Sequence, residues 1–214
     1  QGLIAGINAV QKIRNKAPFV LKRDQAYIGV LIDDLITKGT KEPYRMFTSR
    51  AEYRMLLRQD NADQRLTPLS FDLGLASEER MKACEHKTQR SRSLIRFLKN
   101  QSVSPNTINP ILSSKKSAII KQSCKSDKVL SRPNISLKDL QEVEEIKTHF
   151  SSNGYSKEER DQAEIQIKYR GYIEKEKANA DKLNRLESVR IPKDFEYKKV
   201  KSISAEALEK LLEV

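Results

Sequence analysis

The sequence has 214 residues and carries 41 Lys and Arg against 29 Asp and Glu, a formal net charge of +12 at pH 7. This surplus favours a polyanionic partner, nucleic acid ahead of an anionic membrane surface. Two cysteines and no tryptophan occur, which excludes a disulfide-stapled scaffold and leaves few aromatic rings on which single-stranded bases could stack.

The N-terminal part of the chain predicts two helices. Residues 1–15 place apolar side chains on one helical face. Residues 24–37 start at a capping aspartate and stop before Gly39, a residue typical of helix ends. Asp33 and Asp34 are adjacent in this second helix and should point to different faces, so we do not expect a catalytic pair of carboxylates.

The segment 42–67 is the most distinctive part of the sequence. Ser49 with Glu52 three residues later has the pattern of a capping box, which predicts a short helix. Three arginines recur every four residues and should form one stripe on it: Arg50, Arg54 and Arg58. They could pair with neighbouring carboxylates and hold a domain together, or present planar donors to phosphates.

Downstream of the basic segment the pattern predicts further helices separated by a polar stretch. A short helix covers residues 68–73, and Ser77 caps a longer one that reaches about Asn100. Residues 100–134 are rich in Ser, Lys, Asn and Pro. We expect them to form a surface excursion with one short apolar helix near 111–120.

The C-terminal part predicts three more helices. Ser136 caps a helix that continues to Phe150. Residues 156–159 form a capping box, and the helix that follows, 157–188, contains no proline and would span roughly 48 Å. Ser204 opens a last short helix.

No constellation of residues that carries catalysis is evident in the sequence. The two histidines, His86 and His149, lie in separate predicted helices, and Cys84 has no second pair of ligands with which to build a zinc site. A glycine-rich phosphate loop is also absent. We expect no catalytic residue and no metal ligand in this chain. Cys84 and Cys124 are too few and too far apart for a disulfide framework, which favours a reducing, cytoplasmic location. No run of residues is long and apolar enough to span a membrane, and no secretory signal is evident.

Several stretches of the sequence resemble the MnmG (GidA) family, the tRNA uridine 5-carboxymethylaminomethyl modification enzymes. The resemblance rests on QGLIAGINA at 1–9, on the text of 24–67 and on DLGL at 72–75. The later segments QIKYRGYIEKE, IPKDFEY and SISAEALEKL are similar to the same family in the same order. Arg170, inside QIKYRGYIEKE, stands where an acidic residue is expected, so no role is carried over to it.

The resemblance implies a mostly α fold, in which the end of an FAD-binding Rossmann-type domain precedes a multi-helix C-terminal domain with one long helix. Residues 1–22 would be the last helix of the FAD-binding domain, and residues 23–75 a basic helical segment. Residues 76–192 would form a helical domain with the surface excursion at 100–134. Residues 193–214 would begin a truncated partner-docking subdomain, so we expect the chain to be the C-terminal portion of a longer protein.

The resemblance also implies site residues. Gln1 and Gly2 would lie against the flavin. The tRNA-binding residues would be Arg45, Arg50, Arg54, Arg58 and Arg65, together with Lys38 and Lys41. Of the central arginines, we expect Arg58 to act in binding and Arg54 to be the more structural.

The implied function belongs to the whole enzyme. With its GTPase partner MnmE, a homodimer of the intact protein would add a carboxymethylaminomethyl or aminomethyl group at C5 of the wobble uridine of tRNA, using FAD and NADH. The chain alone should be inactive and should not retain FAD, while contributing tRNA binding and partner docking. The alternative is a stand-alone helical RNA-binding or protein-docking module without catalysis.

Overall fold

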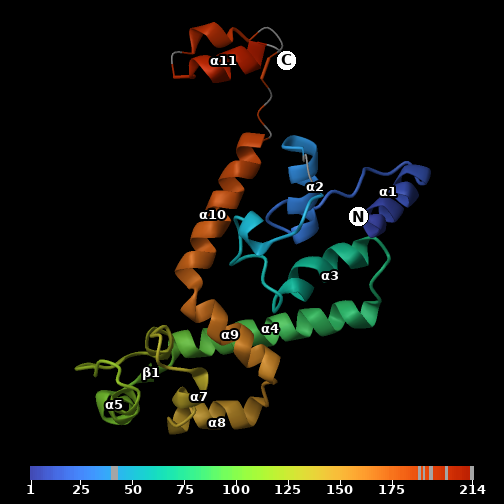
Figure 1. The fold of residues 1–214 in the computed structure, drawn as a ribbon. Coiled ribbons are helices and arrows are strands. Elements are labelled where there is room, and N and C mark those ends of the chain that lie inside the picture. Colours follow the sequence, from blue (N-terminus) through green and yellow to red (C-terminus); the bar gives the residue numbers. More distant parts are fainter. Residues whose placement is uncertain (40–42, 188, 190, 193–194, 201, 213–214) are drawn as a thin grey trace. The chain divides into compact units, whose positions relative to one another are not determined.

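The structure is a computed structural model that describes residues 1–39, 43–187, 189, 191–192, 195–200 and 202–212. These residues are mostly helical, as predicted (Figure 1). They form two compact units, residues 1–177 and 178–214, a division that differs from the predicted boundaries at 22, 75 and 192. Across the described ranges, no helix combines the length and the apolar character needed to cross a bilayer.

The elements follow one another as labelled in Figure 1. Before the strands come α1 (Gly2–Ile13), α2 (Tyr27–Thr37), the 3-10 turn η1 (Thr48–Arg50), α3 (Ala62–Asp72) and α4 (Glu78–Asn100). The short strands β1 (Ser102–Val103) and β2 (Cys124–Lys125) pair antiparallel and flank α5 (Pro105–Ser114). The remaining elements are α6 (Ser126–Leu130), α7 (Leu137–Leu140), α8 (Glu144–Asn153), α9 (Lys157–Lys168), α10 (Arg170–Glu187), η2 (Tyr197–Lys199) and α11 (Ala205–Leu212).

Helix α4 is the element on which α3 and α9 pack (Figure 1). Ser77 caps it by accepting a hydrogen bond from the backbone N–H of Arg80, and the helix ends at Asn100, both as predicted. Its residues Leu94 and Leu98 are fully buried in the main core. Burial of two leucine side chains contributes roughly 3–6 kcal/mol relative to exposed ones.

A charged contact joins α4 to the first turn of α9. Arg90 donates from Nε to Glu159 Oε1 at 2.8 Å, and its guanidinium lies 4.7 Å from the centroid of the Tyr155 ring. The other oxygen of Glu159 accepts from the backbone N–H of Ser156 at 2.8 Å, which completes the predicted capping box. One carboxylate therefore starts α9 and attaches it to α4.

The prediction of a surface excursion at 100–134 is wrong, because this stretch supplies much of the main core. Its fully or almost fully buried side chains include Val103, Ile108, Leu112, Val129 and Leu130. The helix expected at 111–120 lies earlier, since Pro105 occupies its first turn, where no backbone N–H is needed. Many of the polar residues that suggested an excursion are exposed, among them Ser113, Lys115, Lys116 and Lys121, although Ser126 is fully buried.

Two predicted helices are divided in the structure. The helix expected from Ser136 to Phe150 has its predicted cap, but α7 ends at Leu140 and α8 begins at Glu144, with Val143 buried between them. The single helix expected at 157–188 is likewise two helices, α9 and α10, which meet at the non-helical residue Tyr169.

Contacts on α10 explain that second division. Arg170 donates from Nη2 to Asp127 Oδ2 at 2.9 Å. One turn or more along the helix, Glu176 accepts hydrogen bonds from the backbone N–H groups of Met55 at 2.9 Å and Leu56 at 3.3 Å. These partners lie far away in the sequence and set the direction of α10, although no proline interrupts the pattern.

Two predicted helix starts were displaced. α2 begins at Tyr27 rather than at residue 24, because residues 22–26 form a turn in which the backbone N–H groups of Gln25 and Ala26 donate to Lys22 O. The helix predicted to start at Pro68 is α3, which begins earlier, at Ala62. Pro68 lies in its interior, although a proline, which has no backbone N–H to donate, was expected at the first turn.

Candidate functional site

The helix predicted from the Ser49–Glu52 pattern is wrong. Only residues 48–50 are helical there, as η1, and residues 51–59 form turns. The Glu52 carboxylate accepts from Arg23 instead of closing a capping box. The side chains of Ala51, Tyr53 and Leu57 are buried, and the turns of this segment direct them toward the interior of the protein. The three arginines therefore do not form one helical stripe, and each has its own surroundings.

A buried carboxylate organises the region around the basic segment. Asp34 is 2% exposed and accepts hydrogen bonds from Arg23 Nη1 at 2.7 Å, Lys38 Nζ at 2.9 Å and Tyr44 Oη at 2.7 Å. Burial by itself would raise the pKa of the Asp34 carboxyl, but the donors Tyr44, Lys38 and Arg23 outweigh it and hold that pKa well below its usual range. Asp34 is therefore ionised inside the fold.

Arg23, which the sequence did not single out, connects α2 to the basic segment. Besides Asp34 it contacts Asp33 Oδ2 at 2.8 Å and Glu52 Oε1 at 2.6 Å. Asp33 and Asp34 thus share one guanidinium, even though they are neighbours on a helix. The sequence signal for this cation was weak, because one of its three carboxylates lies 29 residues away.

The network ends at an exposed basic loop, residues 43–50. Tyr44 anchors the loop through its hydroxyl group, and the Arg50 guanidinium lies over the Tyr44 ring, 4.6 Å from its centroid. Arg45 and Arg50 are exposed, and Phe47 is 53% exposed beside them. Guanidiniums next to an open aromatic ring suit a phosphate-bearing ligand whose bases can stack.

Arg54 and Arg58 differ in their surroundings, and the difference runs against the expectation that Arg58 is the more available of the two. Arg58 has a side chain 16% exposed and donates from Nε to Asp60 Oδ1 at 3.1 Å. Asp60 also accepts from Gln162 Nε2 at 2.6 Å, so the pair belongs to an internal network. Arg54 is exposed, and it donates from Nε to the carbonyl oxygen of Ala51 at 3.2 Å. Arg54 is the more available cation.

The other predicted basic residues are also engaged to different degrees. Arg65 donates to the carbonyl oxygens of Gln25 and Arg58 and to Asn61 Oδ1. Its burial, with the Arg58 charge, lowers the pKa of its guanidinium. Lys38 contacts Asp34, although its side chain remains 65% exposed. Lys41 lies outside the described residues.

Gln1 and Gly2, the predicted flavin contacts, stand at the start of α1 and are both exposed. A Cβ built at Gly2 would meet no atom within 4 Å. Two open positions can add contacts to a flavin that other residues hold, but they do not form a flavin site by themselves, and we assign no step of a reaction to them.

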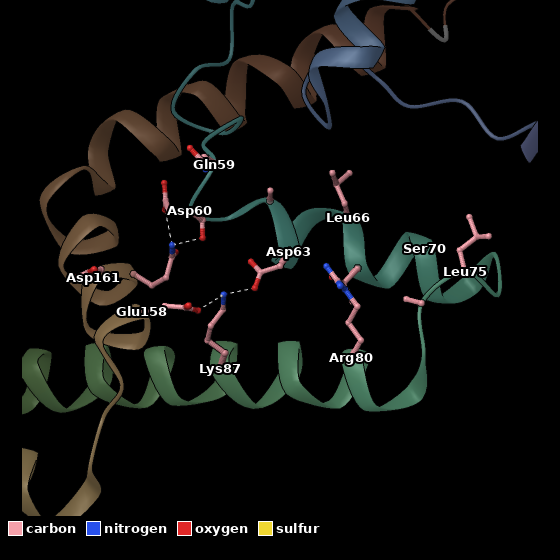
Figure 2. Close-up of a pocket in the computed structure, with 14 residues that line it drawn as sticks. Gln59, Asp60, Asp63, Leu66, Ser70, Leu75, Arg80, Lys87, Glu158 and Asp161 are labelled. Carbon is pink, nitrogen blue, oxygen red and sulfur yellow. Dashed lines mark hydrogen bonds and ion pairs between the residues drawn. The ribbon is translucent and has the colours of Figure 1, made fainter. Parts of the chain in front are cut away.

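A pocket of about 960 Å³ lies between α3, α4 and α9 (Figure 2). Lys87 of α4 extends between Asp63 of α3 and Glu158 of α9 and contacts both carboxylates. The ionisable lining residues are Asp60, Asp63, Glu158, Asp161, Arg80 and Lys87. With four carboxylates and two cations, this pocket does not suit a phosphate ligand. Its charges hold the three helices together.

The described residues offer no catalytic or metal-binding constellation. No group of three or more His, Cys, Asp or Glu side chains there could hold a metal ion. The His149 ring stacks on Phe97 with centroids 3.6 Å apart, and its Nε2 lies 3.2 Å from the Tyr155 hydroxyl. Burial lowers the pKa of His149, which favours a neutral ring that serves packing.

Residues 78–177 match the family model described as the tRNA modifying enzyme MnmG/GidA C-terminal helical domain. Two relatives carry the name tRNA uridine 5-carboxymethylaminomethyl modification enzyme MnmG. The one from Flavobacterium johnsoniae is 61% identical over 99% of this chain, and the one from Christiangramia forsetii is 58% identical over all of it.

A solved structure is also similar. GidA of Aquifex aeolicus, in its form II crystal, has a TM-score of 0.71 and 38% sequence identity, covering 99% of this chain and 32% of that one. The chain spans about a third of the length of the curated relatives it matches, since it covers 34% of each of the two named above.

Proposed function

Because the chain belongs to the MnmG (GidA) family, we propose that it is part of a tRNA uridine 5-carboxymethylaminomethyl modification enzyme and that it contributes a tRNA-binding surface. The residues that we propose for this surface are the exposed arginines Arg45, Arg50 and Arg54, with Lys38 at its edge. The observation that carries the proposal is their availability. Within the described ranges these three arginines form no ion pair with a carboxylate, whereas Arg58 does.

The geometry suggests how this surface would act. Asp34 and Arg23 are buried or nearly so, and they hold Tyr44, on which Arg50 stacks. The arginines of the loop are therefore presented from a supported base and lose less freedom when they bind phosphate. Guanidiniums fit phosphate oxygens with paired donors, and such contacts are independent of base sequence. The surface would position tRNA without choosing among tRNAs.

The remaining functions follow from the family as proposals. FAD and NADH would supply the redox chemistry in the whole enzyme, with Gln1 and Gly2 adding flavin contacts at the end of a Rossmann-type domain, residues 1–22. The product would be a carboxymethylaminomethyl or aminomethyl group at C5 of the wobble uridine. A homodimer would act together with the GTPase MnmE, which would dock at residues 193–214.

The double variant Arg45→Ala/Arg54→Ala tests the tRNA-binding surface. We expect tRNA binding to weaken about tenfold for all tRNAs alike, because phosphate contacts are lost. The slope of log affinity against log salt concentration should become shallower by about 0.7–0.9 for each lost contact. Fluorescence anisotropy with a labelled tRNA at several salt concentrations measures both quantities.

Arg58→Ala is the contrasting variant. Because Arg58 pairs with Asp60 inside the fold, its loss should lower the free energy of unfolding by about 1–2 kcal/mol, less than for a fully buried pair. Its salt slope should match that of the unmodified protein. If Arg45→Ala/Arg54→Ala also left the slope unchanged, the proposed surface would be wrong.

A further inference from the structure

A basic groove, separate from the pocket of Figure 2, lies on the other face of the α3–α4 pair. It has a volume of about 910 Å³ and shares no lining residue with the pocket of Figure 2. Its α3 wall includes Gln64 and Arg65, and its α4 wall includes Glu85, Arg92 and Arg96. The groove is therefore built from two rigid helices that pack directly on each other.

The charges of this groove are not balanced by the fold. Arg92 and Arg96 are exposed and stand one helical turn apart, an arrangement of like charges that is unfavourable by a few tenths of a kcal/mol, roughly. Neither pairs with a carboxylate in the part of the chain that the structure describes. Glu85 is the single acidic residue of the lining. Three guanidiniums thus face one carboxylate.

Arg65 is unusual because its bonds are all to neutral oxygens. It donates to two backbone carbonyls and to the Asn61 amide oxygen, and its guanidinium is partly buried next to Arg58. A buried cation normally has an anionic partner. The charge of Asp60 acts on Arg65 without a direct contact. A bound anion would supply the directly bonded anionic partner that the described side chains do not.

Gln64 provides an independent observation in the same lining. Its side-chain nitrogen Nε2 is buried and has no hydrogen-bond partner among the described residues. An unpaired buried donor destabilises the fold, so such groups are uncommon unless something outside the fold satisfies them. Gln64 lines both this groove and a smaller pocket of about 290 Å³ that Arg58 and Arg170 also line. We infer that a ligand oxygen in the groove accepts this hydrogen bond once the side chain turns toward it.

We propose that the α3–α4 groove binds backbone phosphates of RNA, as a second contact in addition to the exposed arginines of residues 43–54. The inference rests on the proposed tRNA-binding function. Arg92 and Arg96 would contact successive phosphates along α4, Arg65 would neutralise charge at the floor, and Gln64 would donate to a phosphate oxygen. Phosphate is favoured over a carboxylate ligand because three planar cations gather on one face.

The test compares two double variants in the full-length protein, each of which removes two positive charges. Arg92→Ala/Arg96→Ala removes the groove cations. The control, Lys82→Ala/Lys147→Ala, removes two exposed lysines that pair within their own helices with Glu78 and Glu144. Binding of an unmodified tRNA transcript is followed by fluorescence anisotropy at several salt concentrations.

For the groove variant we expect the log–log salt slope to fall by about 1.4–1.8, the sum for two phosphate contacts. The control should change the slope by less than about 0.5. If tRNA bound the unmodified protein but the groove variant kept its full slope, the groove proposal would be overturned while the proposed function stood. If the unmodified protein bound no tRNA, both would be overturned.

Gln64→Met gives a readout that folding alone cannot imitate. Because it removes an unpaired buried donor at similar volume, it should leave the melting temperature unchanged or raise it. If Gln64 donates to a phosphate, the same variant should bind tRNA several-fold more weakly. A higher melting temperature with unchanged tRNA affinity would remove Gln64 from the groove site.

Discussion

At the scale of single residues, Asp34 is the charge on which the order of the basic loop depends. It is 2% exposed and holds Arg23, Lys38 and Tyr44. We expect Asp34→Asn to lower the free energy of unfolding by about 2–4 kcal/mol, because three donors lose an ionised acceptor. It should also weaken tRNA binding, since Tyr44 would no longer hold the loop. Urea denaturation and the anisotropy assay measure the two effects.

Asp33→Asn is the matched control, one residue away on the same helix. Asp33 contacts Arg23 at 2.8 Å, but its side chain is 38% exposed. A partly exposed ion pair is worth less than about 1 kcal/mol. A loss in the Asp33 variant as large as that in the Asp34 variant would contradict the central place of Asp34.

The low pKa of Asp34 also predicts a dependence of stability on pH. The carboxyl has a lower pKa in the folded protein than its ordinary value of about 3.9 in an unfolded chain. Its contribution to stability is therefore present above about pH 4 and declines as the pH falls below that value toward the folded pKa. In Asp34→Asn this part of the acid dependence should be missing. Denaturant titrations between pH 7 and pH 3 would reveal it as a flatter profile.

At the scale of elements, the features that the sequence predicted well are those decided by neighbours in the chain. Helix caps are the clearest case. Ser77, Ser136 and Ser156 begin helices as expected. Gly39, which was expected to end a helix, follows α2 with a positive φ. Each cap needs only three or four consecutive residues, so a local pattern is sufficient to find it.

Elements decided by distant partners were predicted poorly. The expected capping box at Ser49 failed because Glu52 belongs to Arg23, and the expected long helix failed because Glu176 holds the turn at Met55. The candidate site shows the same limit. The sequence pointed to a group of arginines, but it could not tell that Arg58 is paired with Asp60 while Arg54 is exposed.

Two glycines give a matched test of these local rules. Gly154 ends α8 with φ +57°, so Gly154→Ala should cost about 1 kcal/mol. Gly171 lies within α10, and a Cβ there would meet no atom within 4 Å. Gly171→Ala should therefore stabilise the protein by about 0.5–1 kcal/mol. Thermal melts of the two variants should shift in opposite directions, and a shift in the same direction would contradict this account.

At the scale of the whole molecule, the net charge of +12 is distributed between paired and available cations. Lysine and arginine side chains such as Lys87 and Arg90 are used to hold helices together. Net charge therefore overstates the surface that is free to bind RNA. The part that we propose for RNA binding is the loop at residues 43–50, Arg54 and the α3–α4 groove.

The smaller unit carries the proposed docking site for the GTPase. In α11, Leu208 and Leu211 are half-buried, while Leu212 is 53% exposed. Leu212→Lys keeps a residue suited to a helix C-terminus but removes apolar contact area. We expect it to weaken GTPase binding at least about tenfold, or roughly 1.4 kcal/mol, by calorimetry. Lys210→Ala, which removes an exposed lysine paired with Glu206, should bind as the unmodified protein does.

The Glu159 carboxylate, which binds both the Ser156 N–H and Arg90, should slow the opening of the N-terminal end of α9. First turns usually fray, so their amide protons exchange with solvent quickly. In α9, exposing the N–H of Ser156 also requires Glu159 to leave Arg90 of α4. That amide should exchange with deuterium only when the two helices separate. The first turn of α1, which has no side-chain cap and no buried residue, should exchange within the earliest time points of the same experiment.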